Sequence, residues 1–109
     1  MGDRGQVKII QWDEKPVYLY SHYDGYRMDE IVENVLKRRK RWDDGPYLSR
    51  MIFCEMVKDD VGGELGYGIS SSECDHYVSV NIHIKNETIE IVKYGETTFS
   101  GSFEEFLER

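Results

Sequence analysis

Aromatic and basic side chains gather in one short stretch of this sequence. Tyr20, His22 and Tyr26 fall close together, with two further tyrosines and Arg27 beside them. Aromatic rings with arginine can stack on a planar ligand and pair with its anionic groups, and the same residue types form the centres of protein-binding surfaces. We therefore predict a binding site made of the following residues: Arg4, Tyr20, His22, Asp24, Tyr26, Arg27 and Trp42. An alternative interpretation, tyrosines on a half-exposed sheet, fits the spacing equally well.

The pair His22 and Asp24 permits a second chemistry. An imidazole titrates near neutral pH, and a carboxylate two residues away could orient it. This pair would suit a small hydrolase acting on a nucleotide or phosphoester, with His22 as the general base. We rank this enzyme below a non-enzymatic protein and assign no catalytic residue. Ser70 follows a glycine-containing stretch, but the pattern is not the Gly-x-Ser-x-Gly of a nucleophile elbow.

Metal and cofactor sites have no clear sequence signal. The three histidines lie on separate segments and form neither a Cys-x-x-Cys nor a His-Glu-x-x-His pattern, so we predict no metal site. Residues 62–68 are rich in glycine but lack the Lys-Ser/Thr that completes a P-loop. They predict a turn rather than a phosphate cradle, and we expect no cofactor.

The charge balance is acidic, with one local exception. Fourteen basic against 21 acidic side chains give a net charge of -7, which makes nucleic acid an improbable partner. Residues 37–41 are nevertheless five consecutive basic residues. We favour the end of a helix for this run, where cations complement the helix dipole, and keep an anion-binding patch as the alternative. An acidic DNA mimic is a further hypothesis, but it rests on the charge alone.

The two cysteines and the hydropathy pattern bear on the compartment. Cys54 falls in an apolar helical pattern and is expected in the core, whereas Cys74 falls in a polar stretch and is expected to be exposed. A disulfide framework in a secreted chain of this size would need more cysteines. No apolar run approaches the roughly 20 residues of a membrane helix, and no secretory signal is evident. We expect a cytoplasmic protein without a membrane partner.

Hydrophobic periodicity predicts a single domain, residues 1–109, in which strands and helices come in blocks. Strands are expected over residues 6–11, 17–22, 67–71, 77–85 and 88–94, and helices over residues 29–41, 46–58 and 103–107. This order predicts an α+β fold with a mostly antiparallel sheet of about five strands. The two central helices should cover one face of the sheet. The other face should carry tyrosines, histidines, Ser79 and Asn81.

Several short motifs resemble those of a known group of proteins. The residues concerned are Met1-Gly2-Asp3-Arg4, Tyr20-Ser21-His22-Tyr23-Asp24-Gly25, Arg41-Trp42-Asp43-Asp44, Tyr47-Leu48-Ser49-Arg50-Met51-Ile52-Phe53-Cys54-Glu55-Met56 and Gly66-Tyr67-Gly68-Ile69. Together they are similar to a set of short uncharacterised proteins of bacteriophages, prophages and bacterial genomes. The resemblance covers roughly the first 70 to 85 positions, and this chain departs from it at Gly5 and Tyr23, where Ala and Trp are usual. It implies an origin and no activity.

These observations lead to one preferred function. We expect a small non-enzymatic binding protein of phage or mobile-element type, in the cytoplasm of the host cell. It would inhibit a host protein, for example in an anti-defence role, or sequester a small anionic ligand. Edge strands or the aromatic face could also support a homodimer.

Overall fold

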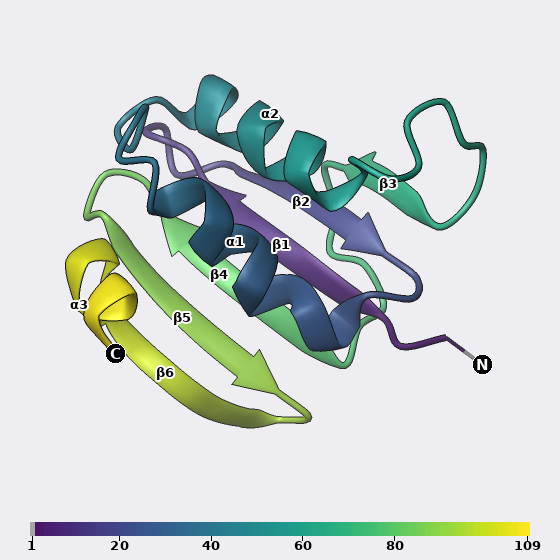
Figure 1. Cartoon of the computed structure of the whole chain (residues 1–109). Helices are drawn as coiled ribbons and strands as arrows, with labels where there is room; N and C mark the ends of the chain where they lie inside the picture. The colour runs from purple at the N-terminus through teal and green to yellow at the C-terminus, as the bar shows by residue number, and fades with distance from the viewer. Residues whose placement is uncertain (1) are drawn as a thin grey trace.

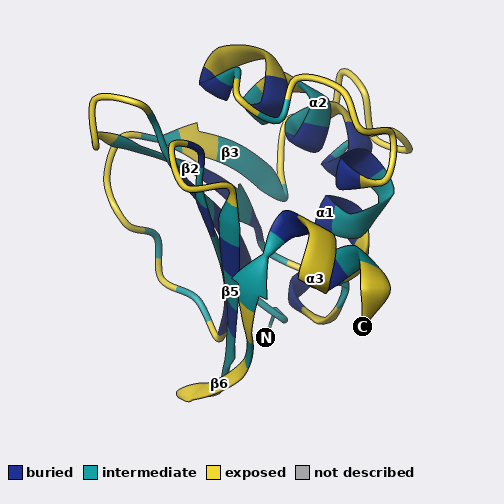
Figure 2. Cartoon of the chain, turned by 90° about the vertical axis from the view of Figure 1, so that its left-hand side faces the viewer, coloured by how far each residue is buried: buried dark blue, intermediate teal, exposed yellow. Residues whose placement is uncertain are grey.

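The computed structural model describes residues 2–109 as one six-stranded sheet with helices on one face (Figures 1 and 2). The strand order across the sheet is β3-β2-β1-β4-β5-β6, and only the central pair β1 and β4 is parallel. The strands are β1 (Gly5–Ile10), β2 (Pro16–Ser21), β3 (Tyr67–Ser70), β4 (Val78–His83), β5 (Thr88–Lys93) and β6 (Glu96–Ser102). The helices are the 3-10 turn η1 (Gly25–Arg27), α1 (Met28–Leu36), α2 (Gly45–Met56) and α3 (Phe103–Glu108). The predicted α+β class and mostly antiparallel sheet are confirmed. No helix in the described part of the chain is long and apolar enough to cross a membrane.

Alternating apolar residues build the core between the sheet and the helices. Val7, Val80 and Ile91 lie side by side on neighbouring strands and are almost fully buried. The helices cover them with an apolar stripe at helical spacing, such as Leu48 and Ile52 on α2. The opposite face of the sheet is polar, as predicted.

A sixth strand corrects the expectation of five. β6 pairs with β5 through a two-residue turn in which Tyr94 and Gly95 both have positive φ, of 52° and 84°. This geometry matches the twist of a tight hairpin. β6 forms the edge of the sheet, and Phe99 is its only large apolar residue. Because an exposed edge strand needs no continuous apolar face, hydrophobic alternation did not reveal it.

The first helix is shorter than predicted. α1 begins at Met28 and ends at Leu36, so the basic run of residues 37–41 follows the helix instead of forming its last turns. The indole nitrogen of Trp42 donates a hydrogen bond to the carbonyl oxygen of Leu36 at 3.0 Å. This contact satisfies one of the carbonyl groups that a helix end leaves unpaired. Residues 37–41 contain no apolar side chain, so a longer helix would bury no further apolar surface against the sheet.

Cys54 is a second correction, because its thiol is exposed and not part of the core. The buried stripe of α2 passes through Leu48, Ile52 and Met56, each four residues apart. Cys54 lies two residues from Ile52, which is about 200° around the helix, and therefore faces away from the sheet. Cys74, expected to be exposed, is half-buried.

The connection from β3 to β4 shapes the polar face of the sheet. β3 is at one edge, and β2 and β1 lie between it and β4, so residues 71–77 must cross both. The backbone N–H of Cys74 donates to the side-chain oxygen of Gln6 at 3.1 Å, which holds this crossing segment against the polar face. Figure 2 shows the segment on the side away from the helices.

Candidate functional site

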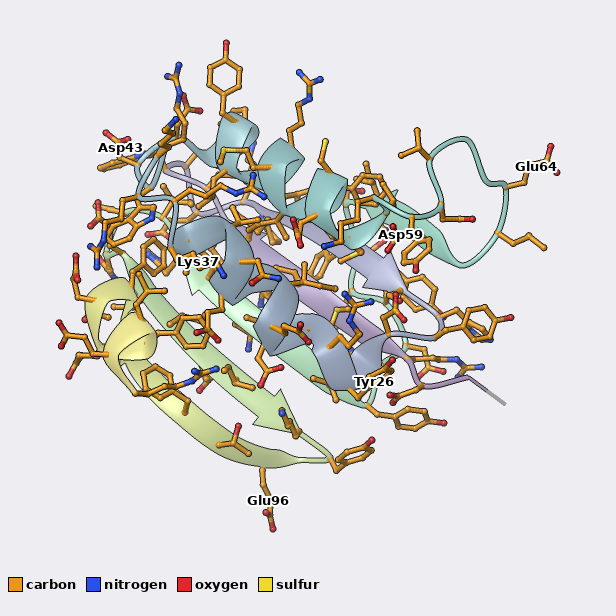
Figure 3. All side chains as sticks on the ribbon, in the orientation of Figure 1. Tyr26, Lys37, Asp43, Asp59, Glu64 and Glu96 are labelled. Atoms are coloured by element: carbon orange, nitrogen blue, oxygen red, sulfur yellow. The ribbon has the colours of Figure 1, made fainter. Side chains whose placement is uncertain are left out.

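Six of the seven predicted binding residues lie at one end of the sheet. β1 begins where the antiparallel β2 ends, since Gly5 pairs with Ser21. Arg4 therefore lies beside the end of β2 that carries Tyr20 and His22. Asp24 follows in the next turn, and Tyr26 and Arg27 form η1. This end of the sheet is where β1 begins and β2 ends, and Figure 3 shows Tyr26 there.

Trp42 does not join this group. Its ring packs edge-on against Phe103 with 5.3 Å between centroids, and its indole binds the end of α1. In Figure 3 its sequence neighbour Asp43 lies at the opposite end of the molecule from Tyr26. Trp42 thus closes the core between α1 and α3.

The N-terminal segment is fixed against η1 by backbone contacts. Gly25 donates its N–H to the carbonyl oxygen of Asp3 at 2.7 Å, and Tyr26 donates its N–H to the Asp3 carboxylate at 2.9 Å. A Cβ atom at position 25 would approach the carbonyl oxygens of Asp3 and Arg4 to 2.8 and 2.9 Å. Only glycine permits this approach without a shift of the backbone, so Gly25 positions Arg4.

His22 and Asp24 have different partners. The Nδ1 atom of His22 lies 2.9 Å from the hydroxyl of Tyr20, whereas the Asp24 carboxylate accepts a hydrogen bond from Tyr67 at 2.6 Å. No hydrogen bond among residues 2–109 joins His22 to Asp24. The bond to Asp24, together with burial, raises the pKa of Tyr67 to about 12. Asp24 therefore links η1 to the start of β3.

A cavity of about 430 Å³ opens beside Arg4, between the polar face and the crossing segment. Its lining consists of Arg4, Tyr20, Gly68, Ile69, Ser70, Cys74 and Asp75. We call it the Arg4 pocket. The guanidinium of Arg4 pairs with the Asp75 carboxylate at 2.5 Å, and the Asp75 side chain is 80% exposed. Burial, followed by the charge of Glu73, raises the pKa of the Cys74 thiol.

Exposed tyrosines surround the same end of the sheet. Tyr23, Tyr26 and Tyr94 are each more than 60% exposed. Tyr77 stacks on Tyr94 with 6.2 Å between ring centroids. Among the described residues, Arg27 forms one long ion pair, with Glu30 at 3.9 Å, and its side chain is half-buried. This end therefore presents aromatic area to solvent, with a weakly paired guanidinium beside it.

The sequence prediction missed the members of this site that come from distant segments. Tyr67, Cys74 and Asp75 reach it through β3 and the crossing segment, and Tyr94 through the hairpin of β5 and β6. Only the strand order shows that these segments meet, and alternation does not give that order. The polar stretch around Cys74 was visible in the sequence, but it is typical of any surface connection and does not indicate a site.

The other two histidines do not line the Arg4 pocket. The Nδ1 atom of His76 is 2.7 Å from the carbonyl oxygen of Cys74, and the Nε2 atom of His83 is 2.9 Å from the Glu14 carboxylate. Across residues 2–109, no three His, Cys, Asp or Glu side chains come together as a metal site.

Comparisons with protein-family models, with curated proteins and with solved structures each find no match for this chain. The resemblance to short phage and bacterial proteins therefore stays a prediction. The function has to be argued from the geometry of the site.

Proposed function

We propose that this protein is a non-enzymatic binding protein that sequesters a small anionic ligand in the Arg4 pocket. One observation carries the proposal: Arg4 and Tyr20 line the same cavity, of about 430 Å³. Clefts of roughly 300–1,000 Å³ are typical of small-molecule sites. The lining of the pocket is largely apolar with few polar groups, which is the usual composition of such a site.

The ion pair between Arg4 and Asp75 explains how an anion would enter. An ion pair with one strongly exposed partner contributes only about 0–1 kcal/mol to stability, so releasing Asp75 costs little. A carboxylate or phosphate of the ligand would take its place on the guanidinium and form two parallel hydrogen bonds. The Tyr20 ring and the backbone of Gly68, which also line the pocket, would then contact the rest of the ligand.

The hydrolase alternative receives less support from the geometry. A general base needs an orienting partner on its second nitrogen, and the carboxylate proposed for that role is held by Tyr67. The Nδ1 atom of His22 instead lies beside the Tyr20 hydroxyl, next to the Arg4 pocket. We therefore assign His22 a positioning role, in which it orients the Tyr20 hydroxyl.

Two substitutions with opposite expected effects test the pocket. Native mass spectrometry of the protein from bacterial cells would first reveal a retained small ligand. NMR titration with citrate and with nucleoside monophosphates would then identify anions that shift the Gly68 and Cys74 amides. We expect Arg4→Gln to weaken binding about tenfold and Asp75→Asn to strengthen it up to about fivefold, because Asp75 competes with the ligand.

Arg27→Gln is the matched control, since Arg27 lies at the same end of the sheet but outside the pocket. It should leave the affinity within about twofold. Equal losses in Arg4→Gln and Arg27→Gln would show a general charge effect and contradict the pocket. No retained mass and no shift with any of these anions would also reject it.

A second candidate function, inhibition of a host protein, is favoured by the exposed tyrosines. Tyrosine and arginine are enriched where binding energy concentrates in protein interfaces. Tyr26 and Tyr94 are 65% and 68% exposed on the same end of the molecule. If a protein partner co-purifies from a bacterial host, Tyr26→Ala should abolish its retention while Arg4→Gln does not. The reverse pattern would contradict an interface at this end.

A further inference from the structure

A second cleft lies on the outer side of α2, away from the Arg4 pocket. Its cavity of about 320 Å³ is lined by Arg38, Arg41, Tyr47, Arg50, Met51 and Cys54. We call it the arginine cleft. It shares no lining residue with the Arg4 pocket. In Figure 3, Lys37 marks the end of α1 that is farther from Tyr26, and the cleft residue Arg38 follows it in the chain.

The path of the basic run explains how its side chains converge. On a continuous helix, five consecutive residues would point around the whole circumference. Here the helix ends at Leu36, and the backbone turns left-handed at Arg39 and Arg41, with φ of 55° and 62°. Arg38 and Arg41 consequently reach the same cleft, whereas Arg39 leaves it to pair with Glu104. This conformation therefore allows part of the basic run to form an anion-binding patch, the alternative to a helix end.

Positive charge in the cleft exceeds the negative charge available to neutralise it. Glu55, which is 8% exposed, is shared between Arg38 at 3.0 Å and Lys58 at 2.9 Å. Those contacts, with a hydrogen bond from Asn34, hold the pKa of Glu55 below its usual range despite its burial.

The second carboxylate is committed in a similar way. Asp44 lies 3.6 Å from Arg41 and uses its other oxygen to accept the N–H of Tyr47 at the start of α2. Arg50 enters no ion pair among the described residues. The cluster therefore contains four cations, counting Lys58, and two carboxylates, those of Glu55 and Asp44. An anionic ligand would balance this excess.

We propose that the arginine cleft binds a small phosphorylated compound, with a phosphoryl group between the guanidinium groups of Arg38, Arg41 and Arg50. Guanidinium groups bind phosphate with paired, charge-assisted hydrogen bonds, and three arginines line one cleft here. The organic part of the compound contacts Tyr47 and Met51. The Arg41 guanidinium already stacks on the Tyr47 ring, 4.7 Å from its centroid, which preorganises this side of the cleft.

A free small compound suits the whole molecule better than a nucleic acid. The net charge of -7 repels a long polyanion, because many phosphates would lie near acidic surface. A single phosphoryl group within the cleft meets only the local positive charge, since screening at physiological salt acts over about 8 Å. The cleft volume is likewise that of a small-molecule site.

The test uses the full chain with pyrophosphate and ADP as probes, measured by calorimetry at low and physiological salt. We expect both to bind wild type and the affinity to fall about tenfold in Arg50→Gln, which removes a guanidinium not engaged in an ion pair. Arg50→Lys should restore part of the affinity, because it keeps the charge but not the paired donors. Lys85→Gln is the matched control: it makes the same change in net charge in an exposed turn that does not line the cleft, and it should bind like wild type.

The two cysteines report which cavity is occupied. Cys54 lines the arginine cleft and Cys74 the Arg4 pocket, so alkylation followed by mass spectrometry separates the sites. Pyrophosphate should slow alkylation of Cys54 and leave the rate at Cys74 unchanged. Protection of Cys74 alone would place the anion in the Arg4 pocket and overturn the proposal.

Two further outcomes would also overturn it. One is equal affinity of wild type and Arg50→Gln for both probes, or no binding at millimolar concentration. The other is binding of a single-stranded oligonucleotide without binding of either small probe, which would favour a nucleic-acid surface. Circular dichroism of each variant confirms that a lost affinity is not lost folding.

Discussion

The left-handed backbone at Arg39 and Arg41 shows how single residues shape the arginine cleft. A left-handed conformation costs a residue with a side chain roughly 1–2 kcal/mol relative to the ordinary helical region. Two such residues lie within three positions, at φ of 55° and 62°. Such strain tends to occur where the surrounding structure requires a particular side-chain placement. Here the placement brings Arg41 to the cleft and Arg39 to Glu104 and the ring of Trp42.

The strain at Arg41 can be measured by comparing two substitutions that both remove the guanidinium. We expect Arg41→Gly to be more stable than Arg41→Ala by about 0.5–1 kcal/mol, because glycine adopts positive φ without strain and loses part of that gain through its flexible unfolded state. At Arg50, inside α2, the order should reverse, with Gly about 1 kcal/mol less stable than Ala. Urea unfolding of the four variants measures these differences. The same order at both positions would show that the backbone at Arg41 is not left-handed in solution.

At the scale of elements, a single hydrogen bond ties β3 to η1. Tyr67, the first residue of β3, donates to Asp24 at 2.6 Å, and Asp24 immediately precedes η1. β3 has only four residues and pairs on one side only, with β2. The tyrosine therefore supplements a short ladder at the edge of the sheet and helps to hold the wall of the Arg4 pocket.

This bond has a defined pH dependence. The pKa of Tyr67 is about 12 in the folded protein, chiefly because it donates to Asp24, whereas an unfolded tyrosine titrates near 10. Since the folded pKa is the higher one, the stabilisation is fully present below about pH 10 and is lost as the pH rises through about 12. We expect absorbance titration to show one phenolate forming near pH 12, and Tyr67→Phe to remove that step. Tyr47→Phe, at an exposed ring, should retain it.

Some elements were predictable from the sequence because they satisfy local rules. Val80 and Ile82 alternate with polar residues and gave β4, and the Ser102–Glu105 capping box gave α3, where both reciprocal hydrogen bonds are present. The end of α1 and the edge strand β6 were not predictable in this way. The backbone turns after Leu36 determine where α1 ends, and pairing with β5 determines β6. Neither feature produces a periodic apolar pattern in the sequence.

The residues of the candidate site were likewise predictable only where they are neighbours in sequence. Tyr20, His22 and Asp24 were predictable as neighbours, because they follow one another in the chain. Asp75 and Tyr94 were not, since the crossing segment and the last hairpin bring them to that end. The grouping of Trp42 with the tyrosines failed in the structure for the same reason: residue type indicated a binding role, whereas its contacts with Leu36 and Phe103 make it part of the packing.

At the scale of the whole molecule, the parallel pair β1 and β4 joins the two halves of the chain. The register places Val7 beside Val80 and Ile9 beside Ile82, and all four side chains are fully buried. The helices of the first half cover strands of the second half, as Figure 1 shows for α1. Neither half can bury its apolar face alone, because the first half supplies the two central helices and the second half supplies strands that they cover. The chain should therefore fold as one cooperative unit.

Trp42 provides a local reporter of this cooperativity. We expect urea unfolding followed by Trp42 fluorescence, in a Trp12→Phe background, to have the same midpoint as unfolding followed by circular dichroism. Trp42 reports the contact of α1 with α3, whereas circular dichroism averages over the sheet. A fragment of residues 1–64 should be unfolded, because β1 would lose β4 and the core would lose Phe103 and Phe106. Separate midpoints, or a folded fragment, would contradict a single unit, and both cavities would then have to be assigned to parts that fold independently.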